Sequence, residues 1–387
     1  MLRGMSADAT LFADAAQRRA AGWLAAWDAQ GTHRTATAGD AAGAAWLAAE
    51  AAALGAEVEI EEFALDRLDP VEAYLEIASE RTPAVPVFDA PATDAAGIMG
   101  ALGRDIAVAQ LSPRAVYSGE FARLRRAGGH RGLVVVCAGE RSGMGLLNAE
   151  QFRAPYGAPA IHIASEAGAS VLAALARGAP ARLVAHSRRT AASAANVVVR
   201  LAGSGDRLAP LVVMTPRSSW WQSTAERGGG ILCWLEALRA LLAAPPARPV
   251  IFTANSGHEL GHLGLDDFVA RRKGCEERAI WVHFGANLGA AGGTLAAMSA
   301  SAELRALAAA ELTRAAAPHT LAAPDLVPSG ETRDIHRKGG SYLTLVGTNP
   351  LFHLPQDRWP DAVDLAAALR IAAAASRIVV ALAGASH

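Results

Sequence analysis

Carboxylate and imidazole groups follow three separate apolar runs of the chain. The residues that carry these groups are Glu226, His258, Glu259 and His353. In open α/β sheets, functional groups gather at the carboxyl ends of the strands. If the apolar runs are strands of one sheet, these four residues therefore converge at one edge of it.

The segment 258–262 also reads His-Glu-Leu-Gly-His, which matches the HExxH pattern. In that pattern two histidines one helical turn apart bind zinc and the glutamate is the base. However, the apolar run 250–253 reads as a strand that leads almost directly into His258. Gly261 and Gly264 would each cost about 1 kcal/mol inside a helix. The context therefore favours a turn after a strand over a zinc-binding helix.

Three further residues in the first polar segment could contact a ligand. Arg217 could bind a substrate carboxylate, and Trp220 and Trp221 could form an aromatic wall beside it. Packing of this loop against a neighbouring module is the alternative. For Glu259 and His353 the alternative to metal binding is a polar cluster, with the glutamate capping a helix and the histidine bonded to a loop carbonyl.

The elements that must position these groups follow from periodicity. Helical patterns cover 7–29, 40–54, 230–242, 302–316 and 361–383, and strand-like runs cover 56–61, 131–136, 158–163, 196–201, 210–214, 249–253, 279–284 and 341–346. Strand, helix and strand in succession imply a parallel or mixed sheet with helices on its faces. Pro360 followed by Asp361 predicts the start of the last helix.

Composition limits the classes of partner. The 387 residues are 52% hydrophobic, and the formal net charge is -1, so no field favours nucleic acid or an acidic membrane. Cys137, Cys233 and Cys275 are widely spaced, which predicts buried free thiols in a reducing compartment. The N-terminal segment lacks the apolar core of an export signal, so we expect a cytoplasmic protein. The sequence leaves homo-oligomerisation open.

The order of these motifs resembles the co-catalytic zinc aminopeptidases of metallopeptidase family 28, whose relatives include the glutaminyl cyclases. The matching segments are 215–217, 226–230, 258–264, 284–286 and 353–357. The resemblance implies an α/β three-layer sandwich with a mixed, mostly parallel sheet of the zinc exopeptidase type. It also implies a smaller β-rich inserted domain, similar to a protease-associated domain, at 83–190 between two parts of the main domain, 1–82 and 191–387.

The resemblance also implies a ligand set for a single zinc ion. Glu226, Glu259 and His353 stand at the family's ligand positions, and the set is similar to that of the glutaminyl cyclases. His258 stands where the family has its general-base glutamate. A histidine with an ordinary pKa of about 6.5 could take a proton from bound water.

Three positions depart from the family pattern. Thr215 stands where a histidine ligand would be, Arg217 replaces the aspartate that orients it, and Gly285 replaces a further aspartate. These changes imply that one of the two family zinc sites is missing. The first hypothesis is accordingly a single-zinc hydrolase of a peptide or small amide. A non-catalytic binding or assembly protein and a glutaminyl-cyclase-like aminoacyl transferase are the alternatives.

Overall fold

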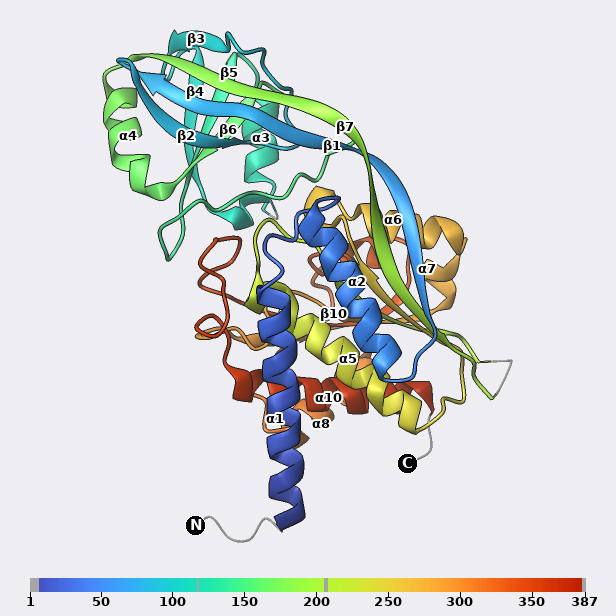
Figure 1. Cartoon of the computed structure of the whole chain (residues 1–387). Coiled ribbons are helices and arrows are strands. Elements are labelled where there is room, and N and C mark those ends of the chain that lie inside the picture. The colour runs from blue at the N-terminus through green and yellow to red at the C-terminus, as the bar shows by residue number, and fades with distance from the viewer. Residues whose placement is uncertain (1–6, 117, 205–207, 385–387) are drawn as a thin grey trace.

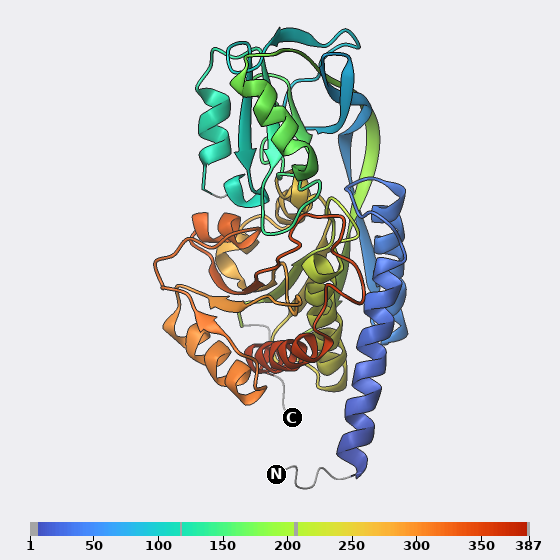
Figure 2. The same ribbon diagram turned by 90° about the vertical axis from the view of Figure 1, so that its left-hand side faces the viewer.

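The computed structural model describes residues 7–116, 118–204 and 208–384 (Figure 1). The first six residues, which form part of the segment expected to lack an export signal, lie outside this description. The chain forms a main domain and a smaller inserted module that lies above it in Figures 1 and 2.

The main domain is built on a mixed sheet with the strand order β12-β11-β13-β10-β8-β9-β7-β1. Its four central strands are parallel to one another, so their carboxyl ends lie at one edge. These strands are β13 (Ser341–Gly347), β10 (Ile280–Phe284), β8 (Leu211–Pro216) and β9 (Val250–Asn255). The flanking strands are β12 (Thr320–Leu321), β11 (Leu295–Met298), β7 (Pro180–Leu201) and β1 (Val58–Ile77).

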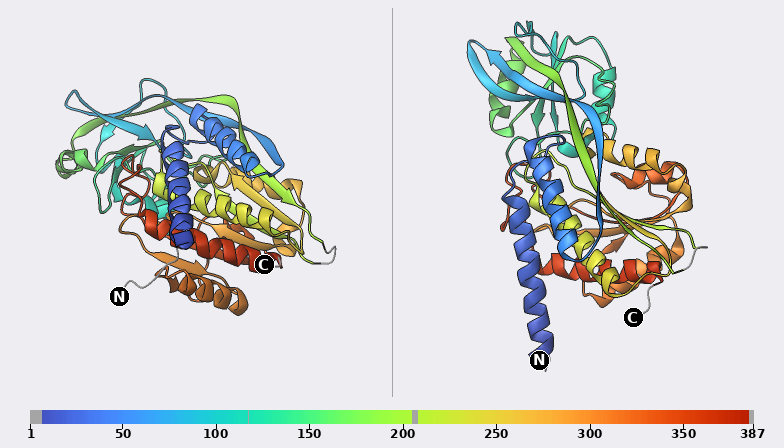
Figure 3. Two further views of the ribbon diagram at one scale, coloured as in Figure 1. Left: turned by 60° about the horizontal axis from the view of Figure 1, so that its bottom comes forward. Right: turned by 45° about the vertical axis from the view of Figure 1, so that its right-hand side comes forward.

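Helices cover both faces of this sheet because both faces of its central strands are apolar. Val282 of β10 lies in the larger core, whereas the preceding Trp281 lies in the core on the opposite face. Figure 3 shows the blue, yellow-green and red helices on the larger-core side. The helices on that side are α1 (Ala7–Asp28), α2 (Ala38–Ala53), α5 (Gly229–Ala243), α8 (Ala302–Arg314) and α10 (Leu365–Ala383), and those on the other are α6 (Leu263–Arg271), α7 (Cys275–Arg278) and α9 (Thr332–Arg337).

A long antiparallel ribbon of β1 and β7 joins the main domain to the inserted module. The module has its own apolar core, in which Val134 and Ile161 are fully buried. Its elements are β2 (Glu80–Pro86), β3 (Ile98–Ala101), β4 (Ile106–Leu111), α3 (Glu120–Arg126), β5 (Gly132–Cys137), β6 (Ala160–Ile163) and α4 (Gly168–Ala176). The expected boundaries at 83 and 190 fall inside β2 and β7, and they stay a prediction.

The expected fold class is confirmed, with one correction at the last helix. Helix α10 begins at Leu365, and Asp364 is its N-cap, accepting a hydrogen bond from the backbone N of Ala367 at 2.9 Å. The predicted start at Asp361 is therefore wrong. Helix α10 is long and apolar enough to cross a membrane, but it packs against α5 in the core, as buried helices of globular proteins do. Cys137, Cys233 and Cys275 are buried free thiols, as predicted.

Candidate functional site

Four predicted polar residues lie in loops at the carboxyl edge of the parallel strands. Glu226 lies in the turn Thr224–Gly228 between β8 and α5, and His258 and Glu259 lie in a short turn after β9. His353 lies in the loop that follows β13. Each loop begins where a parallel strand ends, which explains why residues far apart in the sequence converge here.

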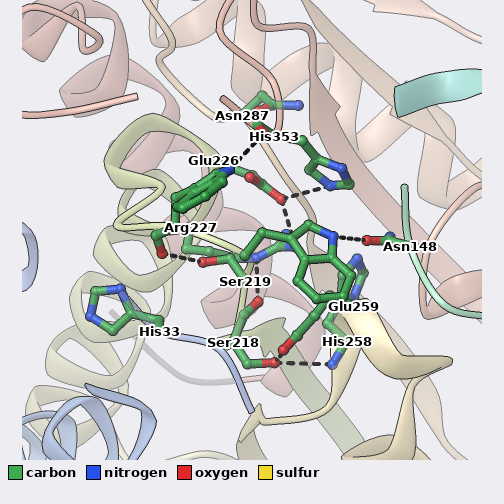
Figure 4. Close-up of polar contacts among 12 residues, drawn as sticks. His33, Asn148, Ser218, Ser219, Glu226, Arg227, His258, Glu259, Asn287 and His353 are labelled. Atoms are coloured by element: carbon green, nitrogen blue, oxygen red, sulfur yellow. Dashed lines mark hydrogen bonds and ion pairs between the residues drawn. The ribbon is translucent and has the colours of Figure 1, made fainter. Parts of the chain in front are cut away.

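Glu226, Arg227 and His353 form a fully buried charged cluster (Figure 4). Oε1 of Glu226 lies 2.7 Å from NH2 of Arg227 and 3.3 Å from Nε2 of His353. Burial disfavours the Glu226 carboxylate, but the charges of Arg227 and His353 outweigh burial and lower its pKa to about 2. Nε of Arg227 donates to the carbonyl oxygen of Ser218 at 2.8 Å, so the guanidinium is fixed against the carboxylate.

Neighbouring groups hold the two ends of this cluster. Nδ1 of His353 donates to the carbonyl oxygen of Leu146 at 2.6 Å, which turns Nε2 toward Glu226. The Asp357 carboxylate accepts from the backbone N of Ala225 at 2.7 Å and from that of Glu226 at 3.0 Å. Burial raises the pKa of Asp357 to about 7. The bond between His353 and a loop carbonyl is the arrangement that the metal-free interpretation predicted for this histidine.

Glu259 is bonded to other groups, although it also is fully buried. Its Oε1 accepts from the backbone N of Thr35 at 2.7 Å and from Thr35 Oγ1 at 2.6 Å, and its Oε2 accepts from Ser218 Oγ at 2.6 Å. Burial raises the pKa of Glu259. Both carboxylate oxygens therefore tie three segments of the chain together.

The predicted zinc ligands do not form one ligand set in this arrangement. Zinc sites in proteins use at least three side-chain ligands at about 2 Å. Over residues 7–116, 118–204 and 208–384, no group of three His, Cys, Asp or Glu side chains is placed to hold a metal ion. Only Glu226 and His353 meet, and the third group beside them is the Arg227 cation. The residues present therefore do not fit a bound zinc.

The positions that depart from the aminopeptidase pattern make contacts within the protein. Thr215 Oγ1 donates to the carbonyl oxygen of Phe284 at 2.8 Å. Arg217, predicted to bind a substrate, is fully buried, and its NH1 lies 2.9 Å from Oδ1 of Asp40. NH2 of Arg217 donates to the carbonyl oxygen of Ala195. These contacts give Arg217 a structural role, and its contact with substrate stays a prediction.

The two tryptophans lie between the main domain and the inserted module. Trp220 is buried, packs on Phe88 with ring centroids 4.6 Å apart, and donates to Asn148 Oδ1 at 3.1 Å. Nε1 of Trp221 donates to the carbonyl oxygen of His353 at 2.9 Å. The contacts of Trp220 match the packing alternative, and an aromatic wall for substrate stays a prediction.

The HExxH segment does not form an α-helix. His258–Leu260 forms one short turn, and both Gly261 (φ 81°) and His262 (φ 65°) have left-handed backbone conformations. The two histidines therefore do not lie one helical turn apart on a helix face. His262 Nδ1 is instead paired with Asp334 at 2.6 Å. The preference for a turn after a strand is confirmed.

Sequence reasoning missed two charged residues of this region, Arg227 and Glu331. Glu331 is fully buried, and its Oε1 lies 3.4 Å from Nδ1 of His258 while its Oε2 accepts from Asn255 at 3.0 Å. Burial lowers the pKa of His258. Arg227 directly follows Glu226 in the sequence, and this position was a signal that it could pair with the glutamate. Glu331 had no signal, because it precedes a short helix far along the chain.

The buried imidazole of His33, which lies beside this region, should make the free energy of unfolding depend on pH. It stacks on Trp27 with ring centroids 3.6 Å apart, and burial followed by the charge of Arg217 lowers its pKa to about 3. Below pH 6.5 the unfolded chain takes up a proton that the folded chain refuses, so the stabilisation is present above pH 6.5 and is lost as the pH falls. In wild type, the difference in His33 protonation between the folded and unfolded states should lower the free energy of unfolding by about 2 kcal/mol between pH 6.5 and 5.0. We expect His33→Gln to abolish this part of the pH dependence.

Urea denaturation at the two pH values tests this, with His130→Gln as the control because His130 is exposed. An unchanged pH dependence in His33→Gln would show that other groups carry the effect.

Solved structures of aminopeptidases share this fold. BSAP, a zinc aminopeptidase from Bacillus subtilis, is 15% identical with a TM-score of 0.75, and the match covers 96% of this chain and 95% of that chain. A Peptidase M28 precursor from Shewanella amazonensis is 16% identical with a TM-score of 0.74, covering 96% of each chain. An aminopeptidase from Aneurinibacillus sp. strain AM-1 is 15% identical with a TM-score of 0.68, covering 95% and 93%.

At these identities the likeness shows the fold, and it confirms the fold that the resemblance in sequence implied. No protein-family model matches the sequence, and no curated protein does.

Proposed function

We propose that this protein is an aminopeptidase-like binding protein that holds a peptide or small amide at the carboxyl edge of its sheet without using zinc. One observation carries the proposal. The guanidinium of Arg227 is paired with Glu226 beside His353, where the resemblance would put a metal ion. The peptide character of the ligand rests on the fold, since the similar solved structures are described as aminopeptidases.

Electrostatics explains why Arg227 and a zinc ion exclude each other. Two unit charges of like sign 4 Å apart repel by about 4 kcal/mol at an effective dielectric constant of 20, so a divalent ion doubles this to about 8 kcal/mol. That repulsion opposes metal binding at a site that offers only Glu226 and His353. Arg227 already supplies the positive charge that the buried carboxylate needs.

Zinc-dependent hydrolysis is the second candidate, because one observation favours it. Both carboxylate oxygens of Glu226 and Nε2 of His353 make no hydrogen bond of good geometry among the described residues, although Oε1 is ion-paired with Arg227. Such buried polar atoms are often completed by an ion or a water. For zinc to bind here, Arg227 would have to leave its place. Aminoacyl transfer would need the same displacement.

Metal content and product analysis separate these candidates. We expect tag-free protein, incubated with zinc and then desalted, to hold no stoichiometric zinc by plasma emission. We also expect it to retain peptides in equilibrium binding while mass spectrometry finds them intact. Stoichiometric zinc that is lost in Glu226→Gln and His353→Gln would overturn the proposal and favour the enzyme. A product heavier by one water would then indicate hydrolysis, and loss of ammonia would indicate cyclisation.

A further inference from the structure

A cavity of about 120 Å³ lies beside the charged cluster, between the main domain and the inserted module. Arg114 of the inserted module forms one wall, and Phe352, from the loop after β13, forms part of another. These two residues also line an adjoining cavity of about 180 Å³. Together the cavities offer room for a small ligand and one further residue of a peptide.

His283, at the end of β10, presents a hydrogen-bond donor to this cavity. Thr344 Oγ1 donates to Thr332 Oγ1 at 2.7 Å, and Thr332 Oγ1 lies 2.6 Å from Nδ1 of His283. The Thr332 hydroxyl accepts from Thr344 and keeps its own hydrogen to donate to Nδ1, so we assign Nδ1 as the acceptor. The ring hydrogen of neutral His283 is therefore on Nε2. Nε2 is buried and has no hydrogen-bond partner in the described part of the chain.

Asn287 presents the complementary acceptor. Its Nδ2 donates to the carbonyl oxygen of Gly347 at 3.3 Å, which leaves Oδ1 as the acceptor. Oδ1 is buried and, among residues that the structure describes, unpartnered. The backbone N of Asn287 donates to the carbonyl oxygen of Glu226 at 3.0 Å, which fixes the residue in place. An unpaired buried donor and acceptor cost free energy until a ligand satisfies them.

Glycine at position 330 keeps the space between the imidazoles open. A Cβ at Gly330 would lie 3.6 Å from Cε1 of His258 and 3.7 Å from Cε1 of His283, so even an alanine there would contact both rings. The backbone φ of 67° also favours glycine.

Arg114 brings an available positive charge to the cavity wall. It is exposed, and its guanidinium lies 5.7 Å from the centroid of the Phe352 ring. Within residues 7–116, 118–204 and 208–384, no acidic side chain pairs with Arg114. An arginine in this position can bind a carboxylate with two parallel hydrogen bonds.

We propose that this cavity binds the carboxyl-terminal residue of a peptide, or an N-acylated amino acid. The ligand's amide oxygen accepts from Nε2 of His283, its amide N–H donates to Oδ1 of Asn287, and its carboxylate pairs with Arg114. This inference rests on the proposed binding function and specifies which end of a peptide is recognised. A donor and an acceptor that line the same cavity can pair with the carbonyl oxygen and the N–H of one amide, and the cation selects the free carboxylate over an ester.

Calorimetry on the full-length protein with three probes tests this inference. We expect N-acetyl-leucine to bind about tenfold or more tightly than its methyl ester, which lacks the charge, and than free leucine, which lacks the amide. Arg114→Gln should weaken N-acetyl-leucine binding by about tenfold or more and leave the ester unchanged. Asn287→Ala should weaken both acylated probes. Arg177→Gln, at another exposed arginine of the inserted module, should change neither.

Equal affinity for acid and ester, or full affinity in Arg114→Gln, would overturn the inference. If longer peptides still bound to zinc-free protein in that case, the proposed function would stand and only the assigned end of the peptide would be wrong. Stoichiometric zinc with cleavage of the probes would instead refute the proposed function. Failure of every probe and every peptide to bind would refute both.

Discussion

Replacing Arg227 by methionine is expected to reduce the free energy of unfolding by about 3–5 kcal/mol. The methionine keeps much of the side-chain volume but removes the cation that lies 2.7 Å from the Glu226 carboxylate. Glu226 is fully buried, so its charge would be left without compensation by water. Urea denaturation at pH 7 measures the loss, and a chelator added to wild type should cause none.

A double-mutant cycle separates the charge from the packing. In the Arg227→Met background, Glu226→Gln removes the unpaired carboxylate and should restore a large part of the lost stability. Glu226→Gln alone leaves Arg227 buried without its counter-charge and should itself destabilise. Purely additive losses would contradict the view that Arg227 neutralises Glu226. Destabilisation of wild type by the chelator would show that a metal ion contributes to the fold.

The fold was predictable from the sequence because its signals are local. The apolar runs 210–214, 249–253, 279–284 and 341–346 became the four parallel strands, since runs of this length and composition suit strands buried on both faces. The start of α10 was misplaced because Asp361 and Asp364 both carry helix-capping side chains. Only the hydrogen bond to the backbone of Ala367 distinguishes them.

The candidate site was predictable in its location but not in its bonds. Strand ends predicted that Glu226 and His353 would meet. The partners of Glu259 could not be predicted, because Thr35 comes from an N-terminal loop about 220 residues away in the chain. The position of the Arg227 guanidinium depends on the turn geometry before α5, where one residue of shift would direct it elsewhere. Sequence spacing does not determine such side-chain directions.

Replacing Glu259 by alanine is expected to reduce the free energy of unfolding by about 3–9 kcal/mol, because two hydroxyl groups and one backbone N–H lose their acceptor and each loss costs about 1–3 kcal/mol. Those donors belong to Thr35 and Ser218, on two different loops. The variant should therefore also expose these loops to limited proteolysis. Zinc content should not change, because the Glu259 carboxylate accepts hydrogen bonds from Thr35 and Ser218 and does not bind an ion.

Glu259→Gln is the matched variant that separates hydrogen bonding from metal binding. The glutamine oxygen can keep both bonds from Thr35, and the Ser218 hydroxyl can rotate to accept from the new amide. Burial raises the pKa of Glu259, so the site tolerates a neutral side chain, and we expect a loss of only about 1 kcal/mol. If Glu259 were a zinc ligand, the glutamine variant would lose the ion and with it any chelator-sensitive stability. A loss in Glu259→Gln as large as in Glu259→Ala, without any metal in wild type, would mean that the charge itself holds the loops together.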